Sequence, residues 1–199
     1  HFWRAIGVIV AATIVLAVTV AISIATVGSA APVLYGVFIG GFLGAGGSAL
    51  TQLAFTGTID PYKVILDGLV GAISGAVAVT AIGLGGSVVF GAVLSGAASI
   101  GEDIMDGVAV DAGKFILSVG LGAVSGLISG AGLDAKTMRS KNNYFKSILK
   151  TAVSKNKVSM YMQKLSVLQK DLIIGITRFA SSIITGHLSS KGLSLIFNK

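Results

Sequence analysis

Side chains that could carry catalytic or metal chemistry are scarce in this sequence. It contains two histidines, His1 and His187, and no cysteine. Without cysteine, disulfides, thiol catalysis and cysteine-ligated zinc are excluded, and the several ligands that a metal site needs do not occur at suitable spacing. Neither histidine has a carboxylate near it in the sequence, and His187 falls on the apolar stripe of a predicted helix. We therefore expect no enzyme activity, no cofactor and no metal site.

The acidic residues Glu102, Asp103, Asp106 and Asp111 form a cluster that allows two interpretations. In the first they belong to a solvated loop between two hydrophobic segments, and Asp111 caps the helix after it. In the second they control membrane insertion, because protonation at low pH would lower the cost of burying them. That cost is about 2.5–3.5 kcal/mol for a charged side chain at the centre of a membrane helix. Liposome insertion measured at neutral and at acidic pH separates the two interpretations.

Most basic residues lie in the last third of the chain. Residues 135–199 contain twelve basic residues and one acidic residue, whereas residues 1–134 contain three basic and seven acidic ones. The lysines of the last third surround apolar stripes at helical spacing, a pattern typical of helices that bind anionic membrane surfaces. We expect no nucleic-acid binding, because a nucleic-acid-binding face would not need the apolar stripe. The predicted membrane-surface residues are Lys146, Lys150, Lys155, Lys157, Lys164 and Lys170.

The composition indicates that membrane helices position these side chains. Of the 199 residues, 53% are hydrophobic and only 12% are charged, and the mean hydropathy is +0.89. Soluble domains carry about 25% charged residues, so too few charges are present here to cover a water-soluble globule. We predict an all-α protein in two parts. Residues 1–134 form a Gly-rich hydrophobic helical-hairpin region, and residues 135–199 form a tail of basic amphipathic helices.

Turn residues divide the first part into apolar segments, and spanning a membrane takes about 20 apolar residues in a helix. Asp60 and Pro61 form an N-cap followed by proline at the first helical position. Breaks are expected at residues 28–32, at the glycines of residues 83–86 and at the acidic residues after 100. The predicted helices cover residues 5–27, 33–55, 61–82, 88–100 and 111–129.

These helices repeat at an offset of 51 residues. The segment Gly-Ala-Ile-Ser-Gly at residues 71–75 matches Gly-Ala-Val-Ser-Gly at residues 122–126. The same offset pairs Asp60 with Asp111 and Lys63 with Lys114. Repeats of this length mark stacked supersecondary units. We therefore predict a duplicated helical hairpin, over about residues 34–82 and 85–133.

Glycines spaced four residues apart supply the packing surface of these hairpins. This spacing places them on one face of a helix, where the missing side chains let two backbones approach closely in lipid. In water, glycines inside helices would cost up to about 1 kcal/mol each relative to alanine, so the pattern favours a membrane. The predicted helix-packing residues of this glycine zipper are Gly36, Gly40, Gly44, Gly71, Gly75, Gly122, Gly126 and Gly130.

The sequence Thr-Gly-Thr-Ile-Asp-Pro-Tyr-Lys at residues 56–63, together with the glycine segment at 71–75, resembles the Gly-rich hydrophobic region of bacterial polymorphic toxins. In Rhs/YD-repeat and LXG-type effectors such regions come after the delivery part. The opening His1-Phe2-Trp3 is similar to the segment directly after the core of an Rhs protein, and a first residue other than Met predicts a segment of a longer polypeptide. The resemblance covers about residues 1–135. It implies a secreted effector whose Gly-zipper C-terminal tip inserts into the inner membrane of a competitor cell.

The resemblance also implies partners. These are an anionic lipid bilayer, further copies of the chain in a membrane homo-oligomer, a cognate immunity protein, and a delivery-protein cage or chaperone. We expect a pore-forming or depolarising antibacterial toxin module. Two alternatives remain: a translocation segment that delivers the basic tail, and a non-toxic membrane scaffold. Toxicity of the tail expressed alone would favour the first, and harmless expression of the whole chain would favour the second.

Overall fold

The computed structural model describes residues 2–28, 30–78, 80 and 83–131 and, later in the chain, 143, 147, 170, 173–175, 177–178, 181–182, 184–186, 188–189 and 193. Over these residues the chain is helical and contains no strand, which confirms the predicted all-α fold. The long helices are α1 (Phe2–Val27), α2 (Ala30–Thr56), α3 (Pro61–Ala78), α4 (Gly83–Asp106) and α5 (Ala112–Ala131).

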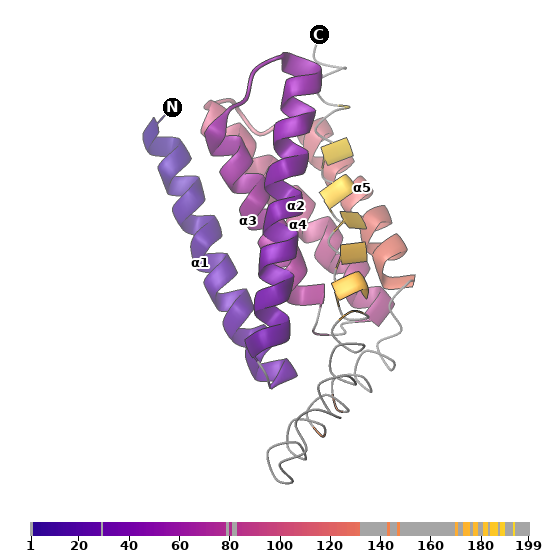
Figure 1. Ribbon diagram of the computed structural model, residues 1–199. Helices are drawn as coiled ribbons and strands as arrows, with labels where there is room; N and C mark the ends of the chain where they lie inside the picture. The colour runs from indigo at the N-terminus through magenta and orange to yellow at the C-terminus, as the bar shows by residue number, and fades with distance from the viewer. Residues whose placement is uncertain are drawn as a thin grey trace.

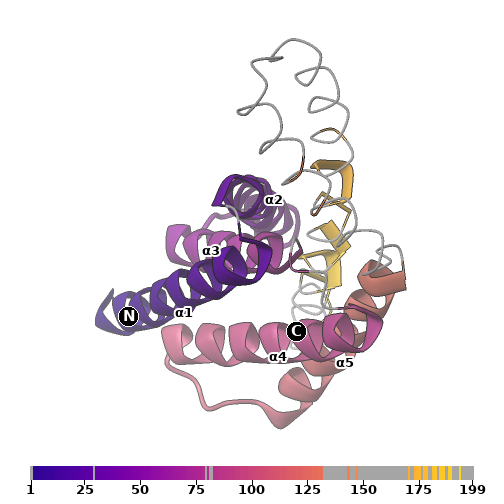
Figure 2. The ribbon, with the colours of Figure 1, turned by 90° about the horizontal axis from the view of Figure 1, so that it is seen from below.

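Helices α2 and α3 form one hairpin, and α4 and α5 form a second (Figure 1), as the 51-residue repeat predicts. Helix α3 lies at the centre, and its residues are buried continuously from Val70 to Ala78. Helix α1 packs mainly on α3 and also touches α2 and α4 (Figure 2). Between the two hairpins, α3 and α4 make a contact that is sparse compared with the contacts inside each hairpin.

The core is made of small and medium aliphatic side chains from four helices. It includes Val27 of α1, Val33 of α2, Val70 and Ile73 of α3, and Leu94 of α4. Elsewhere in these helices, glycines and alanines leave little side-chain bulk between neighbouring helices, so that the helices approach one another closely. Four helices are long and apolar enough to cross a membrane, and they cover Phe2–Val27, Pro32–Thr56, Pro61–Ala78 and Gly85–Asp106.

Several predicted helix boundaries are wrong. Helix α2 begins at Ala30 rather than at residue 33, because Pro32 lies in its first turn, where the missing N–H costs no hydrogen bond. Helix α3 ends at Ala78, four residues before the predicted end. Helix α4 begins at Gly83, so the predicted glycine break is its first turn. It also continues through the acidic residues to Asp106, in place of the predicted loop.

The predicted tail of basic amphipathic helices lies largely outside the described residues. Those that are described between 173 and 189 are helical. They lie beside the first part of the chain, between α2 and α5 (Figures 1 and 2).

Candidate functional site: two glycine-lined hairpins and one charged end

The contact between α2 and α3 is made backbone against backbone at the predicted glycines. Gly36 lies against the carbonyl of Gly75, Gly40 against that of Gly71, and Gly44 against that of Asp67. A Cβ at any of these three α2 glycines would lie closer than 3.0 Å to the backbone of α3, a distance that real Cβ atoms essentially never show. Only glycine permits this approach, so the residues stand where a side chain would separate the helices.

The second hairpin repeats this contact at the equivalent positions. Gly91 and Gly122 lie against each other's carbonyls, and Gly126 lies against the carbonyl of Ser87. The offset of 51 residues converts Gly36, Gly40 and Gly75 into Ser87, Gly91 and Gly126. The interface between the two helices is thus the same in both hairpins. The last predicted packing residue, Gly130, lies in the final turn of α5, and its surroundings are outside the described part of the chain.

The loops that connect the helices of each hairpin also match. In the first, Asp60 Oδ1 accepts the N–H of Tyr62 at 2.9 Å, and Gln52 Oε1 accepts the N–H of Asp60 at 2.7 Å. In the second, Asp111 Oδ1 accepts the N–H of Gly113 at 2.6 Å and of Lys114 at 3.0 Å, while Asp103 Oδ2 accepts the N–H of Asp111 at 3.4 Å. The predicted N-caps at Asp60 and Asp111 are confirmed.

A glycine with a positive φ ends the first helix of each hairpin. Gly57 comes after α2 with φ 70°, and Gly107 comes after α4 with φ 71°. This left-handed conformation is the usual end of a helix and favours glycine. The N–H of Val108 reaches back to the carbonyl of Asp103 at 3.0 Å, which satisfies one of the last carbonyls of α4.

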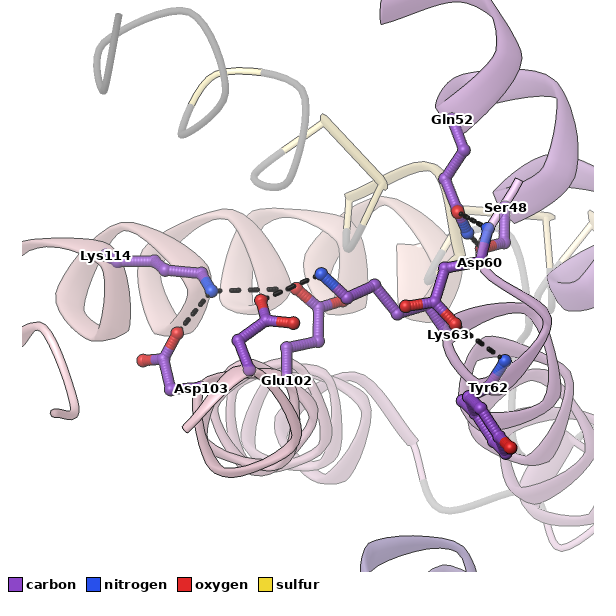
Figure 3. A network of polar contacts seen from close by, with 9 residues as sticks. Ser48, Gln52, Asp60, Tyr62, Lys63, Glu102, Asp103 and Lys114 are labelled. Atoms are coloured by element: carbon purple, nitrogen blue, oxygen red, sulfur yellow. Dashed lines mark hydrogen bonds and ion pairs between the residues drawn. The ribbon is translucent and has the colours of Figure 1, made fainter. Parts of the chain in front are cut away.

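Lysines one helix away hold the acidic residues of α4. Lys114 Nζ lies 2.6 Å from Asp103 Oδ1 and 3.6 Å from Glu102 Oε2 (Figure 3). Both carboxylates are buried, with 4% and 5% of their side-chain surface exposed. Lys63 Nζ lies 2.8 Å from Asp106 Oδ2 in a more exposed pair that joins the first hairpin to the second. The interpretation as a solvated loop is therefore wrong for Glu102 and Asp103, which lie buried in α4 beside Lys114. It holds for Asp111, which is exposed between α4 and α5 and caps α5 as predicted.

The charged residues of helices α1–α5 and of the two hairpin loops gather at one end of the bundle, here called the charged end. They lie in the first turn of α1, the first two turns of α3, the last turns of α4 and the start of α5, on both sides of the two hairpin loops (Figure 1). They are Arg4, Asp60, Lys63, Asp67, Glu102, Asp103, Asp106, Asp111 and Lys114. At the opposite end, residues 28–32 and 79–86 contain no charged residue.

Along its sides the bundle exposes large apolar residues rather than polar ones. Phe38 and Phe42 of α2 are 75% and 81% exposed, and Ile14 and Ile22 of α1 are 60% and 61% exposed. A groove of about 520 Å³ runs between α1 and α4 and is lined mostly by apolar atoms. Buried positions, by contrast, hold Asp67, Glu102 and many serines. This inversion of the soluble pattern suits a lipid environment, because soluble proteins rarely expose wide apolar surfaces.

The remaining predicted site residues divide by position. Lys170 is exposed, whereas Lys146, Lys150, Lys155, Lys157 and Lys164 lie outside the described residues, as do both histidines. Among the described residues, no group of three histidine or acidic side chains could hold a metal ion.

Sequence reasoning missed two features of the site. The first is Asp67, which is 2% exposed at the contact of α2 and α3 and stands where the second hairpin has Ser118, also 2% exposed. The second is the pairing of Lys63 and Lys114 with the acids of α4. The repeat contained a signal for it, because both lysines stand three residues after a capping aspartate.

Comparison of the chain with known protein families, with curated proteins and with solved structures finds no match.

Proposed function

We propose that the chain is a membrane-inserting antibacterial toxin module that permeabilises the target cell's membrane. The observation that carries the proposal is the arrangement of two glycine-lined hairpins with apolar sides, in which α1–α5 and the hairpin loops carry their charges at one end only. An uncharged end can cross the hydrocarbon layer without the cost of burying ions, which is about 2.5–3.5 kcal/mol each. The charged end, with its ion pairs, then remains at the membrane surface where insertion begins.

The resemblance to polymorphic toxins supplies the biological setting of the proposal. In that setting the chain is a secreted effector, acts in the inner membrane of the target cell, assembles with further copies of itself on anionic lipid and is neutralised by an immunity protein. A cage or chaperone shields the exposed apolar sides before delivery. The contacts of Ser182, Gly186 and Leu188 with α2 and α5 favour a tail that works with the hairpins over a tail delivered as a separate effector.

The test is release of a trapped dye from vesicles that contain phosphatidylglycerol, together with loss of an imposed membrane potential. Gly40→Leu places a side chain against the backbone of Gly71, whereas Gly46→Leu on the same helix meets nothing within 4 Å of its Cβ. Overpacking a close contact costs about 1–3 kcal/mol or more. We expect Gly40→Leu to bind vesicles but to lose dye release, and Gly46→Leu to behave as wild type.

The second hairpin offers an independent pair of variants. Gly126 lies against the backbone of Ser87 and Val88, whereas a Cβ at Gly120 of the same helix meets nothing within 4 Å. Gly126→Leu is expected to lose activity and Gly120→Leu to keep it. Tight vesicle binding by wild type without dye release or depolarisation would reject permeabilisation. Full activity of both Gly40→Leu and Gly126→Leu would reject the role of the glycine contacts.

A further inference from the structure

Described residues near the C-terminus lie between the two hairpins and touch both of them. Ser182 Oγ donates a hydrogen bond to the carbonyl of Ser125 on α5 at 2.9 Å. Gly186 lies against the side chain of Ser125 so closely that a Cβ there would lie 2.6 Å from Ser125 Cβ. On the other side, Leu188 lies against Gly47 of α2, where an added Cβ would lie 2.6 Å from Leu188 Cδ1.

The spacing of these residues explains how one segment contacts two helices. Ser182 and Gly186 are four residues apart and share one helical face, the face toward α5. Ile184 and Leu188 share the opposite face, the one near Gly47 of α2, and Ile184 is only 5% exposed. We call the segment defined by Ser182, Ile184, Gly186 and Leu188 the strap; it lies between α2 and α5 in both views (Figures 1 and 2).

The hairpins have few other contacts on that side of the bundle. Helices α2 and α5 make almost no direct contact, and α3 and α4 touch only sparsely. The ion pair between Lys63 and Asp106 joins the hairpins at the charged end, but its side chains are 22% and 34% exposed. Pairs of that exposure contribute little to stability. Helix α1 packs against both α3 and α4, and buried side chains of α3 and α4 share one core. Between α2 and α5, the strap is the described link between the hairpins.

We propose that the strap holds the two hairpins together and must leave the gap between α2 and α5 before they can separate. Its displacement leaves a gap of about 10 Å, the diameter of one helix, and uncovers the faces of α2 around Gly47 and of α5 around Ser125. The part of this inference that concerns dye release rests on the proposed function. A bundle closed by the strap leaks little, and one whose strap is displaced leaks faster.

The distance between the hairpins tests the strap without relying on leakage. The chain contains no cysteine, so Gly46→Cys on α2 and Gly120→Cys on α5 provide the only thiols for spin labels. A Cβ at either glycine meets nothing within 4 Å, so the labels fit without disturbing the bundle. The doubly labelled protein in phosphatidylglycerol vesicles is measured by pulsed electron paramagnetic resonance, and dye release is recorded on the same preparations.

Gly186→Leu displaces the strap from α5, and Thr185→Leu, at an exposed neighbouring position, is the matched control. An exchange variant, Ser125→Gly with Gly186→Ser, moves the side chain across the contact and restores the fit. We expect a narrow distance distribution for wild type, for Thr185→Leu and for the exchange variant. For Gly186→Leu we expect a distribution broadened by about 10 Å. The displaced strap leaves a gap of one helix diameter, so the distance between the hairpins is no longer fixed. Far-UV circular dichroism checks that each variant remains helical.

The outcomes separate the strap from the proposed function. A broadened distribution and several-fold faster dye release in Gly186→Leu alone support both. A broadened distribution with no release from any protein supports the strap and rejects the proposed function. A distribution that stays narrow in Gly186→Leu, or that broadens equally in Thr185→Leu, overturns the strap. If Gly186→Leu has a broadened distribution but releases dye at the wild-type rate, the inference that the strap controls leakage is overturned.

Discussion

Replacement of Lys114 by methionine is expected to destabilise the protein far more than the same replacement of Lys63. Both lysines occupy the same position of the repeat, and methionine keeps the length and flexibility of the side chain while removing its charge. Lys114 faces Asp103 and Glu102, whose side chains are 4% and 5% exposed. Removing one partner from such a buried pair costs about 3–5 kcal/mol, because it leaves buried charge uncompensated.

For Lys63 the expected cost is about 0–1 kcal/mol, because its partner Asp106 is 34% exposed and water can take over the carboxylate. The two variants should therefore differ by at least about 2 kcal/mol, which is more than a tenfold difference in the unfolding equilibrium constant. Unfolding of both proteins in mild detergent micelles, titrated with sodium dodecyl sulfate and monitored by far-UV circular dichroism, measures the difference.

A compensating variant distinguishes charge from packing. Adding Asp103→Asn and Glu102→Gln to Lys114→Met removes the buried charges together with their cation, and should recover most of the lost stability. The reasoning is refuted if Lys114→Met and Lys63→Met unfold at the same detergent concentration. It is also refuted if the triple variant is no more stable than Lys114→Met alone, since the lysine would then act through its aliphatic stem.

Three further predictions concern stability in the same detergent assay. Gln52→Leu should cost about 1–3 kcal/mol, because the partly buried N–H of Asp60 loses its acceptor. A wild-type midpoint would show that this bond is dispensable. Gly57→Ala and Gly107→Ala should each cost about 1–2 kcal/mol, because alanine is strained in the left-handed conformation. The Arg4 side chain lies beside Gly107 but can move away, so we expect the two costs to be equal. Thr26→Val should change stability by less than about 0.5 kcal/mol, because the hydroxyl bonds only back to Ile22 one turn earlier; a larger loss would indicate a polar occupant of the groove between α1 and α4.

Local features of the fold were predictable because the sequence marks them within a few residues. The caps at Asp60 and Asp111, the hairpins and their repeat all derive from turn residues and spacing. The end of α4 was not predictable in this way. Glu102, Asp103 and Asp106 indicate a loop when only their neighbours are considered, and the lysines that let the helix continue stand on other helices. Residues 83–86 indicate a break because glycine weakens helices in water, whereas the environment around the start of α4 is apolar.

Parts of the site depend on contacts between distant segments, and sequence periodicity carries no signal for them. The four-residue spacing of Gly36, Gly40 and Gly44 indicates a packing face, but it does not indicate which carbonyls lie opposite. The approach of Ser182 and Gly186 to Ser125 joins positions 57 and 61 residues apart, outside any repeat. Such contacts become visible only when the two hairpins and the segment between them are placed together.

The two hairpins keep the same interface but have diverged where their loops begin, and this divergence links them. At the position that accepts the N–H of the capping aspartate, the first hairpin has the neutral Gln52 and the second has the carboxylate Asp103. A buried carboxylate requires a cation, and Lys114 of the same hairpin supplies it. Gln52 makes no such demand, so Lys63, the equivalent lysine, is left to pair with Asp106 of the other hairpin. In two identical repeats, each lysine would pair with a carboxylate of its own hairpin. Because the repeats differ, one ion pair instead joins the two hairpins at the charged end.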